Sequence, residues 1–374
     1  MTDGLPERAT VLGSGAGALT IAGELGLAGV DVTVADFPEF APNLEPVAER
    51  GGVEIRCDWH RSTHAPVART SDDPAAAVAG APVVIVSVPS FGHEPFARAL
   101  APVVEDGQTV LWMGEGGGTL SMVAALRKEG RRPDVLLGES NTLPYGARVR
   151  APGALWALRK AGGTLVASLP SSGVKSVFDT ANAIWPWTSP AENVWETVLL
   201  NFNAIDHVAT LLLNLGRVEG RTGNMLLWGE GATPGVARAI GAVDGELLAL
   251  REGLGLANRR RYPEFLAEQG FVDAVRPTLY ETLHASVLAS GTFPCGPEAL
   301  ESRYITEDVP YALVLASSIG REIGVETPVV DALIAIASAV TETDWRARGR
   351  TLAVWDLAGV GVEGLRRAAV EGWW

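Results

Sequence analysis

The stretch Thr10-Val11-Leu12-Gly13-Ser14-Gly15-Ala16-Gly17-Ala18 decides the fold of this 374-residue chain. A short β-branched run leads directly into a glycine-rich turn of the form G-x-G-x-x-A, and a helical pattern follows. Gly13 permits the tight turn, Gly15 lets a pyrophosphate approach the backbone, and Ala18 lets the helix pack on a sheet. The helix N-terminus offers unpaired N–H groups and a favourable dipole to those phosphates. This order of elements predicts a nucleotide-binding βαβ unit.

An acidic residue completes the pattern, because Asp36 ends the next β-branched run, 21 residues after Gly15. A carboxylate at this place accepts hydrogen bonds from the ribose hydroxyls of an adenosine and repels a 2′-phosphate, which favours NAD over NADP. Two alternatives stay open: a glycine-rich turn without a ligand, and an S-adenosylmethionine site built on a similar turn and acid. We assign to the cofactor Gly13, Ser14, Gly15, Ala16, Ala18 and Asp36.

The rest of the N-terminal half repeats this alternation of strand and helix. Further β-branched or apolar runs occupy residues 30–35, 83–88, 109–112, 135–137 and 164–169. Continuous runs of this kind suit parallel strands that are covered on both faces. Val88 and Pro89 leave one such run at the carboxyl edge, where open α/β sheets bind ligands, so both are assigned to the cofactor. We predict an α/β domain of the Rossmann type, a doubly wound parallel sheet, over residues 1–172.

After the turn at 170–173 the sequence is typical of helices. Ser189-Pro190-Ala191-Glu192 has the form of a capping box with proline at the first helical position. No breaker follows before Gly216, which predicts one long helix, and Thr327-Pro328 begins a later one. We therefore predict an all-α domain over residues 173–374.

A polar stripe on the long helix supplies the candidate catalytic group. Asn203, His207, Thr210 and Asn214 lie at i, i+4, i+7 and i+11, a spacing that puts them on one face. Burying such a stripe costs free energy unless each group finds a partner or a ligand. The alternative left open is a stripe that faces water.

A carboxylate that can partner His207 stands in a later helix. Thr306 is expected to cap a helix that ends at Gly324, which places Asp308 in its first turn, where the dipole favours an ionised carboxylate. A carboxylate beside His207 would fix the tautomer of the ring, orient it and raise its pKa. This pair has the features of a general acid/base.

Composition narrows the classes of partner. Lys+Arg 30 against Asp+Glu 44 give a net charge of −14, which disfavours nucleic acid and anionic membranes. No apolar run reaches the roughly 18 residues that span a bilayer. Two cysteines cannot build a disulfide framework, so a reducing compartment, the cytoplasm, is expected. Cys57, His60 and His64 have a spacing open to a metal, but a fourth ligand is missing, and we expect no metal.

Four segments resemble the opine dehydrogenases, the NAD/NADP octopine/nopaline group: residues 9–40, 138–148, 203–219 and 303–310. They keep the order of that family, and the resemblance extends from about residue 8 to residue 345. It implies a Rossmann domain followed by a helical domain. It also implies an NAD(P)H-dependent oxidoreductase that joins an amino acid, or another amine, to a 2-oxo acid and reduces the resulting imine.

The resemblance implies roles for individual residues as well. His207 matches the catalytic histidine of the family and Asp308 its partner. Arg303 matches an arginine that binds the cofactor pyrophosphate, and Asn203 matches an asparagine near the substrate. Tyr145, in the second segment, is assigned to the substrate too.

The chain departs from the family pattern in three places. Val208 stands where a proline is usual, Ala147 where some members carry cysteine, and Trp112-Met113-Gly114-Glu115 where an Asn-Pro-Gly turn is frequent. These departures leave the amine and the 2-oxo acid unidentified. Two other functions stay open: a dehydrogenase of a simple keto or hydroxy acid with the same fold, and a non-enzymatic NAD-binding regulatory subunit. A homodimer is expected.

Overall fold

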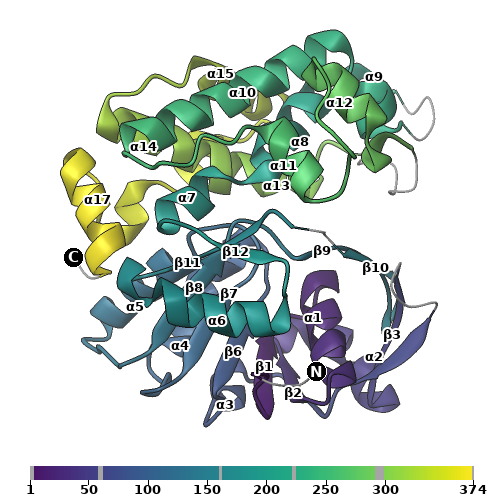
Figure 1. Cartoon of the computed structure of the whole chain (residues 1–374), viewed down its shortest axis with the longest axis vertical. Helices are drawn as coiled ribbons and strands as arrows, with labels where there is room; N and C mark the ends of the chain where they lie inside the picture. Colours follow the sequence, from purple (N-terminus) through teal and green to yellow (C-terminus); the bar gives the residue numbers. More distant parts are fainter. Residues whose placement is uncertain (1–3, 58–61, 160–161, 221–224, 291–298, 373–374) are drawn as a thin grey trace. The chain divides into compact units, whose positions relative to one another are not determined.

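The computed structural model describes residues 4–57, 62–159, 162–220, 225–290 and 299–372, which form two compact units (Figure 1). The first unit comprises Met1–Thr197 and Ala368–Trp374, and the second comprises Val198–Arg367. Within the described ranges, no helix is long and apolar enough to cross a membrane.

The first unit is built on an eight-stranded sheet. Its strands are β1 Arg8–Leu12, β2 Asp31–Ala35, β5 Arg69–Ser71, β6 Val83–Val86, β7 Thr109–Trp112, β8 Leu136–Ser140, β11 Thr164–Ser168 and β12 Thr188–Pro190. They lie in the order β12-β11-β8-β7-β6-β1-β2-β5, and all neighbours run parallel except β8 and β11. The predicted doubly wound sheet is confirmed, with one antiparallel pairing added.

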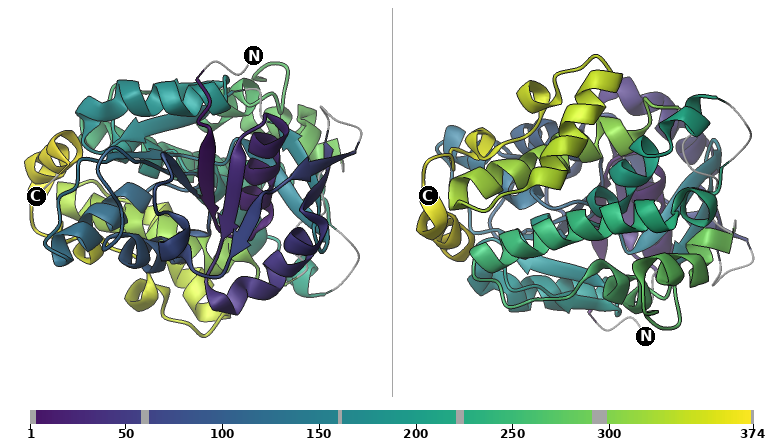
Figure 2. Two further views of the ribbon diagram at one scale, coloured as in Figure 1. Left: turned by 90° about the horizontal axis from the view of Figure 1, so that it is seen from below. Right: turned by 90° about the horizontal axis from the view of Figure 1, so that it is seen from above.

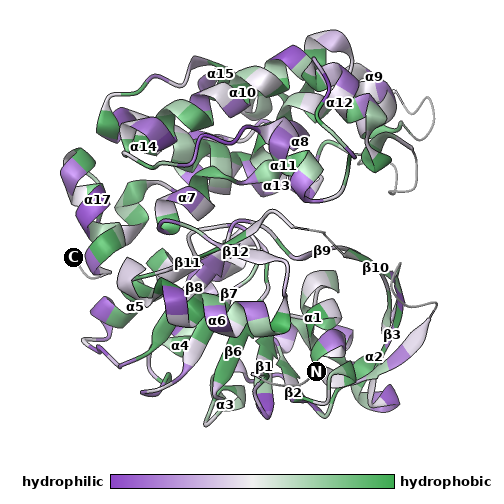
Figure 3. Ribbon diagram, viewed as in Figure 1, coloured by the Kyte–Doolittle hydropathy of each residue, from purple (hydrophilic) through white to green (hydrophobic). Residues whose placement is uncertain are grey.

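Helices cover both faces of this sheet (Figure 2). They are α1 Ala16–Leu27, α2 Ala41–Arg50, α3 Pro74–Ala77, α4 His93–Leu100, α5 Gly118–Lys128, α6 Val174–Ile184 and α7 Val194–Leu199, with 3₁₀ turns at Pro38–Phe40, Ser90–Gly92 and Ser171–Gly173. Helices α1 and α6 share one apolar core with the strands, whereas α3, α4 and α5 pack on one another. Strands β6 and β7 are buried throughout, as parallel strands between two helical layers must be, and β6 appears in green in Figure 3.

A second sheet, which the sequence did not predict, packs on α1. Its strands are β3 Gly52–Cys57, β4 Thr63–Pro66, β9 Tyr145–Ala151 and β10 Ala154–Arg159, in the order β4-β3-β10-β9. Two glycines of α1 permit the close approach. A Cβ on Gly26 would lie 1.9 Å from the carbonyl oxygen of Pro66, and one on Gly23 would lie 2.6 Å from Cδ1 of Ile55.

The described residues of the second unit form helices and no sheet, which confirms the predicted all-α character. Its α-helices are α8 Phe202–Leu212, α9 Leu215–Glu219, α10 Pro234–Gly253, α11 Tyr262–Glu268, α12 Leu279–Ala285, α13 Arg303–Thr306, α14 Val314–Ile323, α15 Pro328–Val340 and α16 Trp345–Arg348, and α17 Gly361–Glu371 begins in this unit. Two π-helical segments, η4 Leu227–Gly231 and η6 Asp308–Leu313, and 3₁₀ turns at Val287–Ser290 and Leu352–Trp355 complete it. Helix α8 contacts α10, α13, α15, η4 and η6.

The prediction of one long helix from Pro190 to Gly216 is wrong. Pro190 lies in β12, and the remainder divides into α7, α8 and α9. The chain leaves the helical conformation at Asn201, whose side-chain oxygen accepts hydrogen bonds from the backbone N–H of Asn203 (3.0 Å) and of Ala204 (3.4 Å). An asparagine that bonds its own backbone in this way starts a new helix in place of continuing the old one.

The two compact units divide after Thr197, whereas the turn at 170–173 predicts a domain boundary at 172/173. Helix α6 and strand β12 stay with the first unit because β12 pairs with β11 in parallel and α6 packs on both strands.

Candidate active site

The glycine-rich turn between β1 and α1 has the geometry of a phosphate cradle. Gly13 adopts φ +112°, and a Cβ there would lie 2.5 Å from the carbonyl oxygen of Ser87. Gly15 is the N-cap of α1, and no side chain caps this helix. A Cβ on Gly15 would meet no atom of the described residues within 4 Å. The helix therefore begins without a side-chain cap and beside an open position at Gly15, which are the features that binding of a pyrophosphate to its first amides requires.

Asp36 and Ser14, both assigned to the cofactor, lie side by side at the end of β2. Asp36 is 5% exposed; its carboxylate accepts hydrogen bonds from the hydroxyl of Ser14 (2.7 Å) and the backbone N–H of Phe37 (2.8 Å). The amide of Asn43 donates to the same serine oxygen (3.0 Å). Burial raises the pKa of Asp36, while the hydrogen bonds from Ser14 and Phe37 oppose that rise. The carboxylate is thus held in one orientation.

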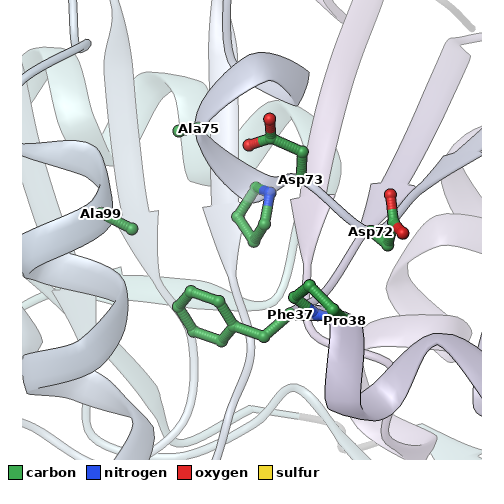
Figure 4. A pocket seen from close by; sticks show the side chains of 7 residues that line it. Phe37, Pro38, Asp72, Asp73, Ala75 and Ala99 are labelled. Carbon is green, nitrogen blue, oxygen red and sulfur yellow. The ribbon is translucent and has the colours of Figure 1, made fainter.

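A pocket of about 320 Å³ adjoins Asp36 along the chain (Figure 4). It is lined by Phe37, Pro38, Asp72, Asp73, Pro74, Ala75 and Ala99. These residues follow the carboxyl ends of β2 and β5 or lie on α3 and α4, at the edge where open α/β sheets bind ligands. The pocket combines an aromatic ring with two carboxylates, so it suits a flat, uncharged or cationic group better than a phosphate.

The other residues assigned to the cofactor edge also lie at carboxyl ends of strands. Val88 and Pro89 are half-buried and follow β6. A Cβ on Gly13 would lie 2.9 Å from Cγ1 of Val88, so the two loops touch. Strand β1 has β2 on one side and β6 on the other, which makes the gap between β1 and β6 the switch point of the sheet.

Glu139, which sequence reasoning missed, organises the neighbouring glycine-rich loop after β7. This glutamate of β8 is fully buried and accepts hydrogen bonds from the backbone N–H of Gly117 (3.0 Å) and Thr119 (3.0 Å). The hydroxyls of Thr119 and Thr197 also donate to it, each at 2.6 Å. Burial raises the pKa of Glu139, and these donors oppose the rise. The carboxylate thereby holds the N-terminus of α5.

We expect Glu139→Gln to lower the free energy of unfolding by about 1–3 kcal/mol, since an NH₂ group would face donors that need an acceptor. Denaturant unfolding measures the change. The matched control is Glu129→Gln on the exposed C-cap of α5, which should alter stability by less than about 0.5 kcal/mol. Equal stability of the two variants would contradict the role given to Glu139.

In the second unit, His207 and Asp308 meet. Nδ1 of His207 lies 2.9 Å from Oδ2 of Asp308, and the two side chains are 13% and 3% exposed. An ionised carboxylate at this distance accepts the Nδ1 proton and leaves Nε2 for other chemistry. The arrangement is that of a histidine oriented for proton transfer.

Asp308 reaches this place by a route that differs from the predicted one. Thr306 does not cap the following helix; it is the last residue of α13, whose N-cap is Ser302. Asp308 instead opens the π-helical segment η6, which leads into α14. Pro310 has no N–H to donate, and this explains the widened turn at that point. Helix α14 does end at Gly324, as predicted, in a left-handed conformation.

Two more residues against the imidazole were missed by sequence reasoning. The ring of Tyr304 stacks flat on that of His207, with centroids 3.6 Å apart and an interplanar angle of 3°. Oδ1 of Asp206 lies 3.9 Å from Nε2 of His207. A signal for Asp206 was available, because it is the one carboxylate within Phe202–Leu212 and it directly precedes His207.

Of the rest of the predicted polar stripe, Thr210 is buried and Asn214 half-buried, and both are bonded within the unit. The hydroxyl of Thr210 donates to the carbonyl oxygen of Asp206, and the amide of Asn214 donates to those of Thr210 (2.8 Å) and Gly231 (3.0 Å). Asn203 is half-buried, one turn before His207 on α8. The alternative of a stripe that faces water is therefore wrong.

Arg303 and Tyr145 lie in different surroundings. The Arg303 side chain is 66% exposed, and its Nε and Nη2 lie 2.6 and 2.5 Å from Oε2 of Glu307. Tyr145 is 3% exposed in the core of the first unit, where its hydroxyl accepts a hydrogen bond from Nε1 of Trp185 (2.8 Å). These are the contacts of a core residue, and a substrate role for Tyr145 stays a prediction.

Among the described residues, no group of three or more His, Cys, Asp or Glu side chains is placed to hold a metal ion. Of the Cys57, His60 and His64 set, His60 lies outside the described residues. Nδ1 of His64 lies 3.2 Å from Oε1 of Glu54 on the neighbouring strand.

The chain is similar to known proteins over nearly all of its length. Residues 190–341 match a family model described as NAD/NADP octopine/nopaline dehydrogenase, alpha-helical domain, and residues 9–165 match one described as ketopantoate reductase PanE/ApbA. An opine dehydrogenase of Arthrobacter sp. (strain 1C) is 31% identical over 359 residues, which cover 96% of this chain and 97% of that protein.

Two solved structures share the fold. An octopine dehydrogenase in complex with NADH and agmatine superposes with a TM-score of 0.79 at 19% identity, covering 96% of this chain and 97% of that one. A yersinopine dehydrogenase with NADP⁺ bound gives a TM-score of 0.72 at 14% identity, covering 99% of each chain. At these identities the two superpositions show a common fold, a Rossmann-type unit followed by a helical one.

Proposed function

This chain belongs to the opine dehydrogenase family, and from that premise we propose that it joins the amine of an amino acid to a 2-oxo acid and reduces the imine. It is an NAD(P)-dependent oxidoreductase acting on a CH–NH bond. The observation that carries the proposal is the 2.9 Å contact between Nδ1 of His207 and Oδ2 of Asp308. The match of residues 190–341 to the family model of the helical domain supports it. A protein that only binds NAD needs the glycine turn but no such pair.

The reaction needs one hydride transfer and three proton transfers, since both N–H protons of the amine leave with the keto oxygen as water and the imine nitrogen then gains one. The amine attacks the keto carbon, water leaves, and the imine gains a hydride at carbon and a proton at nitrogen. His207 holds the mobile proton at Nε2, and Asp308 keeps the other ring nitrogen protonated and the ring oriented. Asn203, one turn away on the same helix, is placed to orient the substrate.

The cofactor of the proposal is NAD, which supplies the hydride when it is bound as NADH. The open amides of α1 fit its pyrophosphate, and Asp36 fits the ribose of the adenosine. The pocket beside Phe37 would take the adenine ring. Arg303 would bind the pyrophosphate as well, by exchanging its bond with Glu307 for one with the phosphates.

We expect NADH to be preferred over NADPH, and Asp36→Asn to lower the ratio of their kcat/KM values by about tenfold or more, or about 1.4 kcal/mol. Because burial raises the pKa of Asp36, the carboxylate gains its proton at a higher pH than an exposed aspartate does. The preference should therefore fall as the pH drops through that raised value. The ratio of kcat/KM between pH 5 and 9 measures it.

Asp36→Asn is also the control for this pH series. The 2′-phosphate of NADPH titrates as well, and the part of the pH dependence that comes from the phosphate remains in the variant, whereas the part that comes from Asp36 is lost. A wild-type enzyme that uses both cofactors equally, or a pH series that coincides with that of Asp36→Asn, would contradict the assignment of Asp36.

The remaining expectations belong to the same proposal. The partners are a small 2-oxo acid and an amino acid or amine, with no nucleic acid and no membrane, and the enzyme is a cytoplasmic homodimer. The net charge of −14 disfavours nucleic acid and anionic membranes, and the low cysteine content suits a reducing compartment.

The experiment follows NADH oxidation with a short 2-oxo acid, in the presence and absence of a panel of amino acids and other amines. The proposal predicts oxidation that requires both substrates. Oxidation with the 2-oxo acid alone would indicate a keto-acid reductase, which the ketopantoate reductase match over residues 9–165 makes the second candidate. Binding of NADH without oxidation under any condition would indicate a regulatory subunit.

A further inference from the structure

We infer that Asp206 is a positioning residue for His207, a second carboxylate that stabilises the protonated imidazole and is itself held by Trp228 and Tyr262. This inference rests on the acid/base role proposed for His207. Asp206 lies outside the pair formed by His207 and Asp308.

The position of Asp206 is fixed by two donors. It precedes His207 on α8 and is 3% exposed. Its Oδ2 accepts hydrogen bonds from Nε1 of Trp228 (2.6 Å) and from the hydroxyl of Tyr262 (2.5 Å). Its other oxygen, Oδ1, lies 3.9 Å from Nε2 of His207. One oxygen of the carboxylate is thus anchored in the bundle, and the other is near the ring.

The hydroxyl of Tyr262 keeps donating its hydrogen bond to Asp206 as the pH changes. Burial, first, and the negative charge of Asp206, second, raise the pKa of Tyr262 well above its usual value. The phenol therefore keeps its proton and continues to donate throughout the range in which a histidine titrates. Trp228 has an indole N–H that can only donate.

The charges around His207 favour its cationic form. Asp308 approaches Nδ1 from η6, Asp206 approaches Nε2 from α8, and Tyr304 of α13 covers one face of the ring. Two cations on the elements packed against this cluster each have a carboxylate of their own: Arg261 pairs with Asp244 (2.5 Å), which also faces Tyr262, and Arg303 pairs with Glu307 (2.5 Å).

The distance decides how Asp206 acts. At 3.9 Å, Oδ1 is too far from Nε2 to take its proton in a hydrogen bond, yet two opposite charges at such a separation in a buried site attract strongly. Asp206 therefore stabilises the imidazolium and leaves the Nε2 proton available to the substrate. A positive charge nearby also stabilises two buried carboxylates more than it stabilises one, and this further favours the protonated ring.

The test is Asp206→Asn, with the pH dependence of kcat in the reductive direction and the NMR titration of His207 as readouts. The chain has five histidines, so the ring signals can be assigned with a His207→Gln spectrum. We expect the high-pH limb of kcat and the titration midpoint of His207 both to move to lower pH by about one unit, a tenfold change in the proton affinity. Asp206→Glu keeps the charge, so its titration midpoint for His207 should lie closer to that of the wild type than to that of Asp206→Asn.

The matched control is Asp244→Asn, the same substitution of a buried aspartate that lies behind Tyr262 and is paired with Arg261. It should leave the titration midpoint of His207 near that of the wild type. An equal shift in both variants would reduce the role of Asp206 to general packing and overturn the inference, as would an unmoved midpoint in Asp206→Asn.

A second variant covers the case in which Asp206→Asn does not fold. In Asp308→Asn, Asp206 is the remaining carboxylate at the ring, and His207 should still titrate above the roughly 6.5 of an unperturbed histidine. A midpoint below that value would overturn the inference. Full activity of His207→Ala would refute the proposed acid/base role instead, and that outcome is distinct from a failure of Asp206 alone.

Discussion

His207→Ala and Asp308→Asn should each lower kcat for the reductive reaction by about 10²–10⁴, while NADH affinity changes little. The reason is the buried 2.9 Å contact between Nδ1 and Oδ2. An asparagine at 308 carries no charge to stabilise the imidazolium, and its NH₂ group can donate to Nδ1 and so hold the ring as the neutral Nε2–H tautomer, which is a far weaker acid. The measurement is steady-state kinetics with calorimetric NADH binding.

The double variant separates a working pair from two independent residues. Because His207 and Asp308 act as a unit, removing both should cost little more than removing either one. The high-pH limb of kcat should also move to lower pH in Asp308→Asn, since the carboxylate that favours the imidazolium is gone. Strictly additive losses, or an unmoved limb, would mean that Asp308 does not partner His207.

Gly15→Ala should weaken NADH binding by about tenfold or more, about 1.4 kcal/mol, without destabilising the protein. Gly15 has φ −78°, which suits alanine, and within the part of the chain that the structure describes a Cβ there would meet nothing within 4 Å. The added methyl group would therefore occupy only the space proposed for the pyrophosphate. Calorimetric titration with NADH and denaturant unfolding measure the two quantities.

Gly13→Ala is the matched comparison, two residues away in the same turn. With φ +112° and a carbonyl oxygen at 2.5 Å from its Cβ, this variant should lose about 1–3 kcal/mol of unfolding free energy or more. If Gly15→Ala bound NADH as the wild type does, the cradle at α1 would not hold the pyrophosphate.

The main sheet could be predicted from the sequence because its strands are buried on both faces. Residues 83–86 of β6 form a continuous apolar run, and a buried strand of this kind can be recognised from the run alone, without knowing which strands it pairs with. The second sheet lacked this signal. Its strand β3 alternates between buried and more exposed residues, and it pairs in parallel with β10, about 100 residues away along the chain. That pairing depends on long-range packing against α1.

The candidate dyad could also be predicted, but its setting could not. Helical spacing and the resemblance pointed to His207 and Asp308, whereas the break at Asn201 and the π-helical turn at Asp308 depend on local bonding that competes with the helix. The stacking of Tyr304 and the anchoring of Asp206 join side chains from separate helices. Local periodicity does not encode such contacts.

The central claim is that hydride adds to an imine made from an amine and a 2-oxo acid. The most direct test supplies NADH deuterated at C4, one stereoisomer at a time, with a 2-oxo acid and an amino acid, and analyses the product by mass spectrometry. We expect one of the two forms to yield a secondary amine with deuterium on the carbon that was the keto carbon, bonded to nitrogen. Deuterium found only in a 2-hydroxy acid, at the same rate with and without the amino acid, would contradict the account.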